Sequence, residues 1–215
     1  MILYTTDQGN YTNYNPSNVL KSQINQNVYV NLTNKCSCNC TFCLRSTKEM
    51  AESNTLWLKQ EPTVQEIVSE LGKCDFSKIK EVVFCGFGEP TMRLDDLIII
   101  AKYLKAINSS IMIRLNTNGL SDLVYKKSTA PLLSGLIDTV SISLNASNAG
   151  EYLRLTRNPF GLNSYQAMLC FAQDCKSYIP NVVLSVVDCI GQEEIDASQA
   201  VCDKIGVKLR VRPFE

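Results

Sequence analysis

The sequence of 215 residues contains no histidine. Histidine is the commonest general base in enzymes and the partner in Ser–His and Cys–His nucleophile pairs, so its absence excludes these mechanisms. It also excludes every zinc site that uses imidazole. The chain has no excess of either charge, because 21 Lys and Arg residues balance 21 Asp and Glu residues. A balanced chain has no overall attraction for nucleic acid or an anionic membrane.

Long apolar runs are also lacking, and none approaches the length of a membrane span. The first 27 residues are polar and lack the basic region and apolar core of a signal peptide. We therefore expect a cytoplasmic protein. With 45% hydrophobic residues the chain can build one full core. We expect an N-terminal extension over residues 1–27 and a single core domain over residues 28–215.

Cysteine, by contrast, is abundant, with ten residues. Disulfides are rare in a reducing cytosol, so these cysteines are expected to be thiols or metal ligands. Six are scattered along the chain, which is typical of buried thiols. The other four lie within eight residues and suggest a metal site: Cys36, Cys38, Cys40 and Cys43.

Short apolar strands alternate with segments of helical periodicity along the chain. The predicted strands are Val28–Thr33, Glu81–Cys85, Ile111–Asn116, Thr139–Asn145, Val182–Asp188 and Val207–Arg212. The predicted helices are Thr63–Leu71, which opens with a capping box, Leu94–Ile107, Ser164–Lys176, Glu193–Lys204 and, less strongly marked, Leu120–Lys127. Repeated strand–helix units predict a parallel sheet with right-handed crossovers.

The predicted strands alternate polar and apolar residues. In Thr139–Asn145, for example, Ser141 and Ser143 oppose Val140 and Ile142. A doubly wound sheet buries both faces, so its strands should be apolar throughout. Six strands are too few to close like an eight-stranded barrel. The pattern therefore predicts a single α/β domain, an open partial (β/α)6 barrel of the incomplete TIM type, with a polar concave face.

The longest irregular stretch, Leu44–Glu61, directly follows the cysteine cluster and contains Trp57. Long loops often serve as lids or binding loops. The alternative is that its apolar residues simply cover one end of the barrel.

Thiolates are the standard ligands of iron–sulfur clusters, and a short loop can place three of them around one face of a cubane. A structural zinc site needs four ligands, and Cys38 could supply the fourth. The spacing Cys36-x3-Cys40-x2-Cys43, with the aromatic Phe42 before the last cysteine, resembles the signature of the radical S-adenosylmethionine (SAM) superfamily. This resemblance implies that Cys36, Cys40 and Cys43 bind three irons of a [4Fe–4S] cluster and that SAM chelates the fourth. Cys38 is extra to the pattern.

Further motifs follow successive strands in the order that this family shows. Gly86-Phe-Gly-Glu-Pro90 resembles the motif that holds the SAM amino group. Asn116-Thr-Asn-Gly119, Ser143-Leu-Asn145 and Arg157 resemble segments near the ribose and carboxylate of SAM. Alone, each would more often be a turn or a solvated charge. The resemblance implies these cofactor-binding residues: Phe42, Gly86, Gly88, Glu89, Pro90, Asn116, Asn118, Ser143, Asn145 and Arg157.

In detail the chain is similar to the small TatD family-associated radical SAM proteins. Three segments carry this likeness: Val83–Thr91, Arg114–Gly119 and Arg210–Glu215. The resemblance implies an electron donor such as flavodoxin or ferredoxin and a functional link to a TatD-type hydrolase. It also implies an oxygen-sensitive reaction in which the reduced cluster cleaves SAM to a 5′-deoxyadenosyl radical. That radical abstracts hydrogen from a substrate, a step that needs no general base.

The substrate is expected to be small and anionic, because Arg114, Arg210 and Arg212 lie on the inward strand face and arginine forks suit carboxylate or phosphate. Alternatively, these arginines pair with internal acids or serve only SAM. Cys85 and Cys189, at strand ends, could donate hydrogen or bind a second cluster, although buried thiols are the commoner case.

Three other functions remain open at this stage. A glycyl-radical-enzyme activase would have a similar size. Nucleobase or tRNA modification is disfavoured by the neutral charge. A zinc or iron–sulfur binding module without catalytic activity would explain the cysteines alone.

Overall fold

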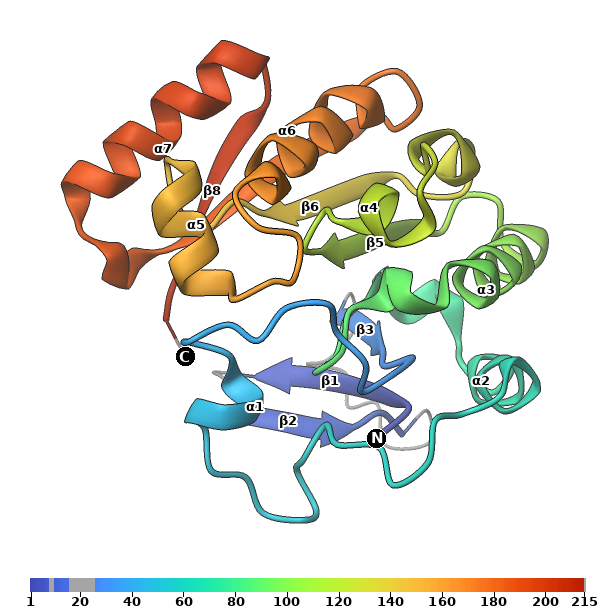
Figure 1. The fold of residues 1–215 in the computed structure, drawn as a ribbon. Helices are drawn as coiled ribbons and strands as arrows, with labels where there is room; N and C mark the ends of the chain where they lie inside the picture. The colour runs from blue at the N-terminus through green and yellow to red at the C-terminus, as the bar shows by residue number, and fades with distance from the viewer. Residues whose placement is uncertain (8–9, 16–25, 215) are drawn as a thin grey trace.

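The computed structural model describes residues 1–7, 10–15 and 26–214. One eight-stranded sheet, in the order β2-β1-β3-β4-β5-β6-β7-β8, runs through it (Figure 1). The last six of these strands are parallel, and each pairs with the next in the chain: β3 (Gln26–Val30), β4 (Ile79–Phe84), β5 (Met112–Thr117), β6 (Thr139–Ser143), β7 (Asn181–Val187) and β8 (Lys208–Arg212). The sheet does not close, since β2 and β8 form its two edges. The predicted open, partial barrel is confirmed.

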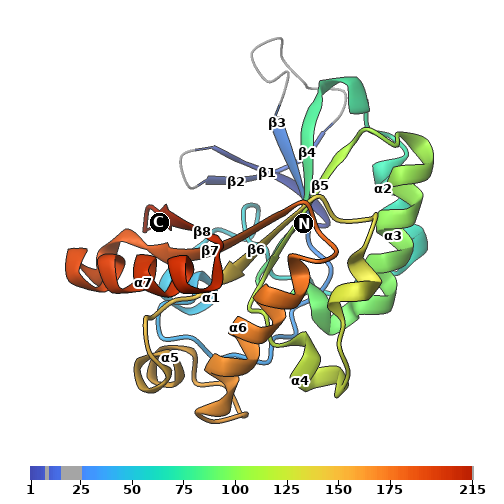
Figure 2. The same ribbon diagram turned by 90° about the horizontal axis from the view of Figure 1, so that it is seen from above.

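Helices cover the convex side of the sheet and leave the concave side open (Figure 2). The longer helices are α2 (Val64–Leu71), α3 (Leu94–Ile107), α5 (Ala149–Thr156), α6 (Asn163–Cys175) and α7 (Gln192–Ile205). Short helical segments complete the set: α1 (Leu44–Thr47), α4 (Ser121–Tyr125), η3 (Phe76–Lys78), η4 (Pro90–Arg93), η5 (Ala130–Leu133) and η6 (Asp188–Ile190). Within the described residues no helix combines the length and apolarity that a membrane crossing requires.

The capping box predicted for α2 is present. The Thr63 hydroxyl accepts from the amide of Glu66 at 3.2 Å, and the Glu66 carboxylate accepts from the amide of Thr63 at 2.7 Å. Two amides without helical partners are thereby satisfied. Helix α3 has the predicted bounds, and α6 and α7 differ from prediction by one residue at each end. Helix α5 was not predicted. Its signal is Asn148, whose side chain accepts from the amide of Glu151 at 3.0 Å as an N-cap.

The segment before residue 28 contributes to the sheet. It holds β1 (Leu3–Asp7) and β2 (Asn10–Asn13), which pair with each other in antiparallel orientation. β1 also pairs with β3 in antiparallel orientation, with Tyr4 opposite Tyr29. Tyr4 and Tyr11 are buried with Leu56 and Phe87 in a small apolar cluster separate from the main core. This hairpin therefore builds one side of the concave face.

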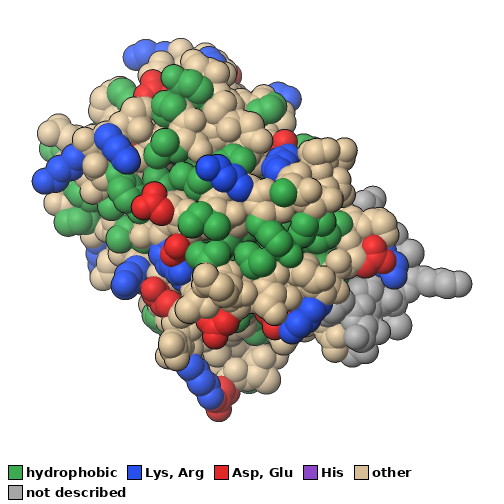
Figure 3. Space-filling model, turned by 90° about the vertical axis from the view of Figure 1, so that its right-hand side faces the viewer, with side chains coloured by type: hydrophobic (Ala, Val, Ile, Leu, Met, Phe, Trp, Pro, Cys, Tyr) green, Lys and Arg blue, Asp and Glu red, His purple; other side chains and the backbone are tan. Residues whose placement is uncertain are grey.

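The main core lies between the sheet and its helices. Leu115, Val140 and Ile142 are fully buried, whereas their neighbours of opposite parity are polar and face the concave side. From α3, Leu97, Ile100 and Leu104 pack into the same core. The outer helical surface mixes apolar and charged side chains (Figure 3). On α3, both Ile99 and Ile107 are exposed. Packing in this core therefore fixes the positions of the strands whose ends shape the site.

Candidate functional site

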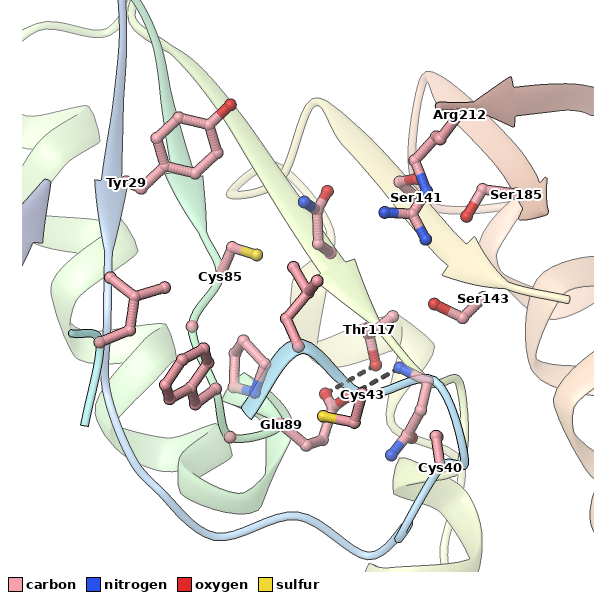
Figure 4. A pocket seen from close by; sticks show the side chains of 18 of the residues that line it. Tyr29, Cys40, Cys43, Cys85, Glu89, Thr117, Ser141, Ser143, Ser185 and Arg212 are labelled. Atoms are coloured by element: carbon pink, nitrogen blue, oxygen red, sulfur yellow. Dashed lines mark hydrogen bonds between the residues drawn. The ribbon is translucent and has the colours of Figure 1, made fainter. Parts of the chain in front are cut away.

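A cavity of about 430 Å³ opens on the concave face at the carboxyl ends of the parallel strands (Figure 4). This is the end at which α/β barrels carry their active sites. Every parallel strand, or the loop that follows it, contributes to the lining. Of the residues predicted for the site, the lining contains Cys40, Phe42, Cys43, Gly86, Gly88, Glu89, Pro90, Arg114, Asn116, Asn118, Ser143, Arg210 and Arg212.

The cysteine cluster lies in the loop after β3. Cys40 and Cys43 line the cavity, whereas Cys38 is only 4% exposed and packs into the main core. Cys36 is half-buried and does not line the cavity, and its sulfur accepts from the amide of Cys38 at 3.4 Å. Among the described residues, no three His, Cys, Asp or Glu side chains converge as a single metal ion would require. In a cubane each thiolate binds a different iron, so three thiols on one loop can hold a cluster without meeting at a single metal ion.

Helix α5 holds the cysteine loop in place. The amide of Asn39 donates to the carbonyl of Thr156 at 2.9 Å, and the amide of Thr41 donates to the carbonyl of Leu155 at 2.9 Å. Both carbonyls belong to the last turn of α5, where helical partners are lacking. The guanidinium of Arg45 closes the loop by donating to the carbonyl of Cys38 at 3.1 Å.

Hydrogen bonds among the thiols shift their pKa values in opposite directions. A hydrogen bond with Cys38 lowers the pKa of Cys36 to about 7 and also lowers the pKa of Cys40. The same hydrogen bonds, together with burial, raise the pKa of Cys38. Burial raises the pKa of Cys43. Cys36 and Cys40 therefore ionise more readily than ordinary thiols, and the thiolate is the form that binds metal.

Gly86 and Gly88 lie in the loop after β4. Glycine is required at both positions because this loop passes very close to another part of the chain. A Cβ on Gly86 would lie 2.1 Å from the Asn31 side-chain oxygen, and one on Gly88 would lie 2.2 Å from the Thr33 carbonyl. The amide of Gly88 donates to that carbonyl at 3.1 Å. The sequence interpretation gave these glycines the task of admitting a ligand. The structure shows that they join the loop after β4 to the chain that leads into the cysteine loop.

The Glu89 carboxylate joins the ends of β4 and β5. It accepts from the Thr117 hydroxyl at 2.7 Å and from the amide of Asn118 at 2.7 Å (Figure 4). It also accepts from the amide and hydroxyl of Thr91. Burial raises its pKa, although these hydrogen bonds act in the opposite direction. Glu89 is 5% exposed and still lines the cavity.

Two asparagines extend this arrangement along β5. The side-chain amide of Asn118 donates to the Ser37 hydroxyl at 3.0 Å, so it joins the end of β5 to the cysteine loop. The side-chain oxygen of Asn116 is buried without a hydrogen-bond partner among the described residues. A buried acceptor of this kind costs free energy unless a ligand donates to it. Asn116 thus marks a polar contact point for a bound molecule in the cavity.

Besides Cys36, two predicted residues lie outside the cavity lining. Asn145 is 6% exposed and adopts a left-handed conformation with φ of 64° just beyond β6. Arg157 caps α5 in the same conformation, with φ of 47°, and its side chain is exposed. The structure therefore does not bring Arg157 to the other predicted SAM-binding residues.

The three predicted arginines line the cavity in different electrostatic settings. Arg114 pairs with Glu81 at 2.9 Å, so the alternative that these arginines pair with internal acids applies to Arg114. No ion pair to Arg210 or Arg212 occurs within the described ranges. Burial lowers the pKa of Arg210, and the charges of Arg114 and Arg212 lower it further. The Nε of Arg212 is buried without a partner among the described residues.

The remaining cysteines occupy varied places. Cys175 and Cys202 are fully buried, which confirms their prediction as core residues. Cys85 lines the cavity, and its carbonyl accepts from the Tyr4 hydroxyl at 3.2 Å. Cys189 is exposed and does not line the cavity. Only Cys85 of the two is placed to meet a substrate.

Sequence reasoning missed an aromatic wall of the cavity. Tyr29 lies across the cavity from Arg212 (Figure 4), and Tyr4 stacks on it with ring centroids 5.0 Å apart. Tyr11 and Phe87 belong to the same wall. The signal was the run of Tyr and Thr before residue 14, which is typical of strands. Ser185 of β7 was also missed, although it repeats the polar alternation of the other strands. The cavity therefore has one aromatic and one cationic side.

The long loop after the cysteines proves to be part of this wall. Leu44 and Leu56 line the cavity, and Leu58 is buried. Trp57 is 44% exposed and packs edge-on against Phe87 at 5.4 Å. The loop thus covers an end of the barrel and contributes to the binding surface at the same time.

Comparison with known proteins agrees with this geometry. A GTP 3′,8-cyclase of Lactiplantibacillus plantarum is 26% identical over 167 residues, which cover 78% of this chain and 47% of that protein. One from Corynebacterium glutamicum is 33% identical over 141 residues, which cover 63% of this chain and 35% of that protein. The chain therefore spans less than half the length of these curated relatives.

Among solved structures, SuiB of Streptococcus suis bound to its precursor peptide SuiA has a similar fold. The TM-score is 0.67 at 18% identity, and the match covers 90% of this chain and 40% of SuiB. The profile of the Radical SAM superfamily matches residues 30–197, which include the cysteine loop and four of the six parallel strands, β4 to β7. The chain belongs to the radical SAM superfamily of enzymes, which use a [4Fe–4S] cluster and S-adenosylmethionine.

Proposed function

We propose that Cys36, Cys40 and Cys43 hold the [4Fe–4S] cluster and that SAM binds beside it in the cavity. The observation that carries this proposal is the shared lining of the cavity by Cys40 and Cys43 with the loop Gly86–Pro90. When bound, the cluster supplies the electron that cleaves SAM to methionine and a 5′-deoxyadenosyl radical. That radical abstracts hydrogen from the substrate.

The chain's own residues hold and orient SAM. Glu89 presents a carboxylate to the SAM ammonium, and the buried oxygen of Asn116 accepts one further hydrogen bond. Asn118 and Ser143 offer polar groups on neighbouring strands, and Phe42 and Pro90 exclude water from the cluster side. Arg157 is not carried into this proposal because its side chain is exposed outside the cavity.

The substrate is proposed to be a small anion. Glu81 neutralises Arg114, so Arg210 and Arg212 are the cations left on the cavity wall without an acid partner among the described residues. Guanidinium groups bind carboxylate and phosphate through paired hydrogen bonds. The relatives named GTP 3′,8-cyclase act on GTP, which is itself an anion with a planar ring. A ring could rest on the aromatic wall that Tyr29 forms opposite these arginines.

The finer assignment is to the TatD family-associated group, in the cytoplasm, with flavodoxin or ferredoxin as electron donor and a functional link to a TatD-type hydrolase. It rests on the three sequence segments that carry the likeness. The proposed chemistry is sensitive to oxygen because a reduced cluster is exposed to whatever enters the cavity.

The decisive experiment is to reconstitute the protein with iron and sulfide under anaerobic conditions, reduce it, add SAM and quantify 5′-deoxyadenosine. Formation in the wild type and its loss in Cys40→Ala are the expected results. Cys170→Ala is the matched control, because Cys170 is exposed on α6 and should leave formation unchanged.

Zinc without iron and sulfide in the purified protein would contradict the proposal and favour a structural metal site. An intact reduced cluster that binds SAM and releases no 5′-deoxyadenosine even with GTP present would contradict the proposed use of an anion of that class.

A further inference from the structure

Tyr152 of α5 carries a hydroxyl group that the structure leaves without a partner. Its side chain is fully buried, and its oxygen has no hydrogen bond among the described residues. Leaving a buried hydroxyl unpaired is costly in free energy. Native proteins rarely retain such a cost without a ligand, ion or water as partner. The environment of this oxygen therefore indicates what it binds.

That environment is the cysteine loop. Tyr152 packs in the same core cluster as Cys38, and Cys36 and Cys40 pack against this cluster. The last turn of the same helix accepts the amides of Asn39 and Thr41, so α5 and the loop are joined along their length. The pKa of Tyr152 is raised by burial and next by the charges of Cys38 and Cys40. The hydroxyl thus lies in the field of the cluster ligands.

The thiol of Cys38 does not accept from this hydroxyl, because the Tyr152 oxygen has no hydrogen-bond partner among the described residues. The cluster adds sulfides and thiolate sulfurs, and both kinds of sulfur accept hydrogen bonds. We propose that the Tyr152 hydroxyl donates a hydrogen bond to a sulfur atom of the [4Fe–4S] cluster site and thereby raises its reduction potential. In this role Tyr152 contacts the cluster and touches neither SAM nor substrate.

The physical basis is that a donor near sulfur stabilises the more negative, reduced cluster. The inference rests on the proposed cluster site, and the experiment separates the two. Wild type, Tyr152→Phe and Tyr165→Phe are reconstituted anaerobically, and the midpoint potential of each cluster is measured without SAM by redox titration with electron paramagnetic resonance. Tyr165→Phe is the control, because the Tyr165 ring packs against Tyr152 at 5.5 Å and its hydroxyl donates to the Ser147 carbonyl at 2.7 Å.

The expected result is a more negative potential in Tyr152→Phe, with wild-type iron content, and no change in Tyr165→Phe. A merely structural role for the hydroxyl would move stability and leave the potential unchanged. An unchanged potential in Tyr152→Phe would overturn the inference, as would an equal shift in both variants.

If Tyr152→Phe fails to assemble a cluster, 3-fluorotyrosine at position 152 replaces it, since fluorine makes the hydroxyl a stronger donor with little change in shape. The potential should then rise, and an unchanged value would again overturn the inference. Failure of the wild type to assemble any cluster would overturn the cluster assignment itself, and this inference with it.

Discussion

Arg114, which lines the cavity, forms an ion pair with Glu81. The Nε of Arg114 donates to the Glu81 carboxylate at 2.9 Å and so joins β5 to β4. Both side chains are largely shielded, with exposed fractions of 9% and 17%. The pair therefore does two things: it fixes two central strands and it removes Arg114 from the charge available to a ligand.

The first prediction concerns this pair. Glu81→Gln leaves the shielded Arg114 without its acid, and removal of one partner from a buried pair costs about 3 kcal/mol. We expect a loss of that order in the free energy of unfolding, measured by urea denaturation of the protein without cluster. The matched control is Glu52→Gln, because Lys59 and Glu52 pair on the surface with 88% and 80% exposure. There the change should stay within about 0.5 kcal/mol. Equal losses in both variants would contradict the prediction.

The second prediction concerns anion binding by Arg212. Its buried Nε has no protein partner among the described residues, so it is free to meet a ligand. Hydrogen bonds to charged groups contribute about 1.5–3 kcal/mol, so Arg212→Ala should weaken GTP binding by at least about tenfold. Equilibrium binding of GTP to the cluster-loaded protein measures this effect.

The control for this measurement is Arg154→Ala, because Arg154 is exposed and pairs with Glu151 on α5. It should leave GTP affinity unchanged. Unchanged GTP binding in Arg212→Ala, together with altered SAM cleavage, would show that Arg212 serves SAM alone.

The third prediction concerns Gly88. A Cβ at this position would lie 2.2 Å from the Thr33 carbonyl and 2.7 Å from that of Lys35, so the two loops must separate in Gly88→Ala. Overpacking of this kind costs about 1–3 kcal/mol. We expect such a loss in urea denaturation and a lower iron content after reconstitution, because the loop to the cysteines shifts.

Gly150→Ala offers a matched control within the same fold. A Cβ there would meet only the Asn148 side-chain oxygen, at 3.6 Å, and the residue is helical. Alanine should therefore stabilise the protein by about 0.5 kcal/mol. A larger loss at Gly150 than at Gly88 would show that the approach of the two loops is not what selects glycine.

Much of the fold could be predicted from local pattern. Strands such as Thr139–Asn145 alternate strictly, and α3 has a clear apolar face, so both emerged from periodicity alone. Helix α5 was missed because it begins with Ala149-Gly150 and carries few apolar residues, although these recur at helical spacing. Its stability comes from contact with the cysteine loop, which is tertiary and invisible in a local window.

The part of the candidate site that carries recognisable sequence motifs could be predicted. The cysteine spacing and the residues after each strand end led to most of the cavity lining. The aromatic wall was missed because β1 joins the sheet only by antiparallel pairing with β3, a contact that no local pattern in a polar segment predicts. Arg157 was taken from its local motif, and the structure places this exposed residue outside the lining of the cavity.

The last prediction concerns Cys38, whose role the sequence leaves open. A four-cysteine zinc site would need Cys38, whereas a three-cysteine cluster site would not. Cys38 is 4% exposed, packs into the core and does not line the cavity, whereas Cys40 lines it. We therefore expect Cys38→Ala to keep the wild-type iron and sulfide content after reconstitution, with the absorption of a [4Fe–4S] cluster, and Cys40→Ala to lose both. The two variants remove the same atoms two positions apart on one loop, so a general disturbance of the loop would affect them alike. Loss of metal in Cys38→Ala, with zinc bound by the wild type, would instead make Cys38 a ligand and the loop a four-thiolate site.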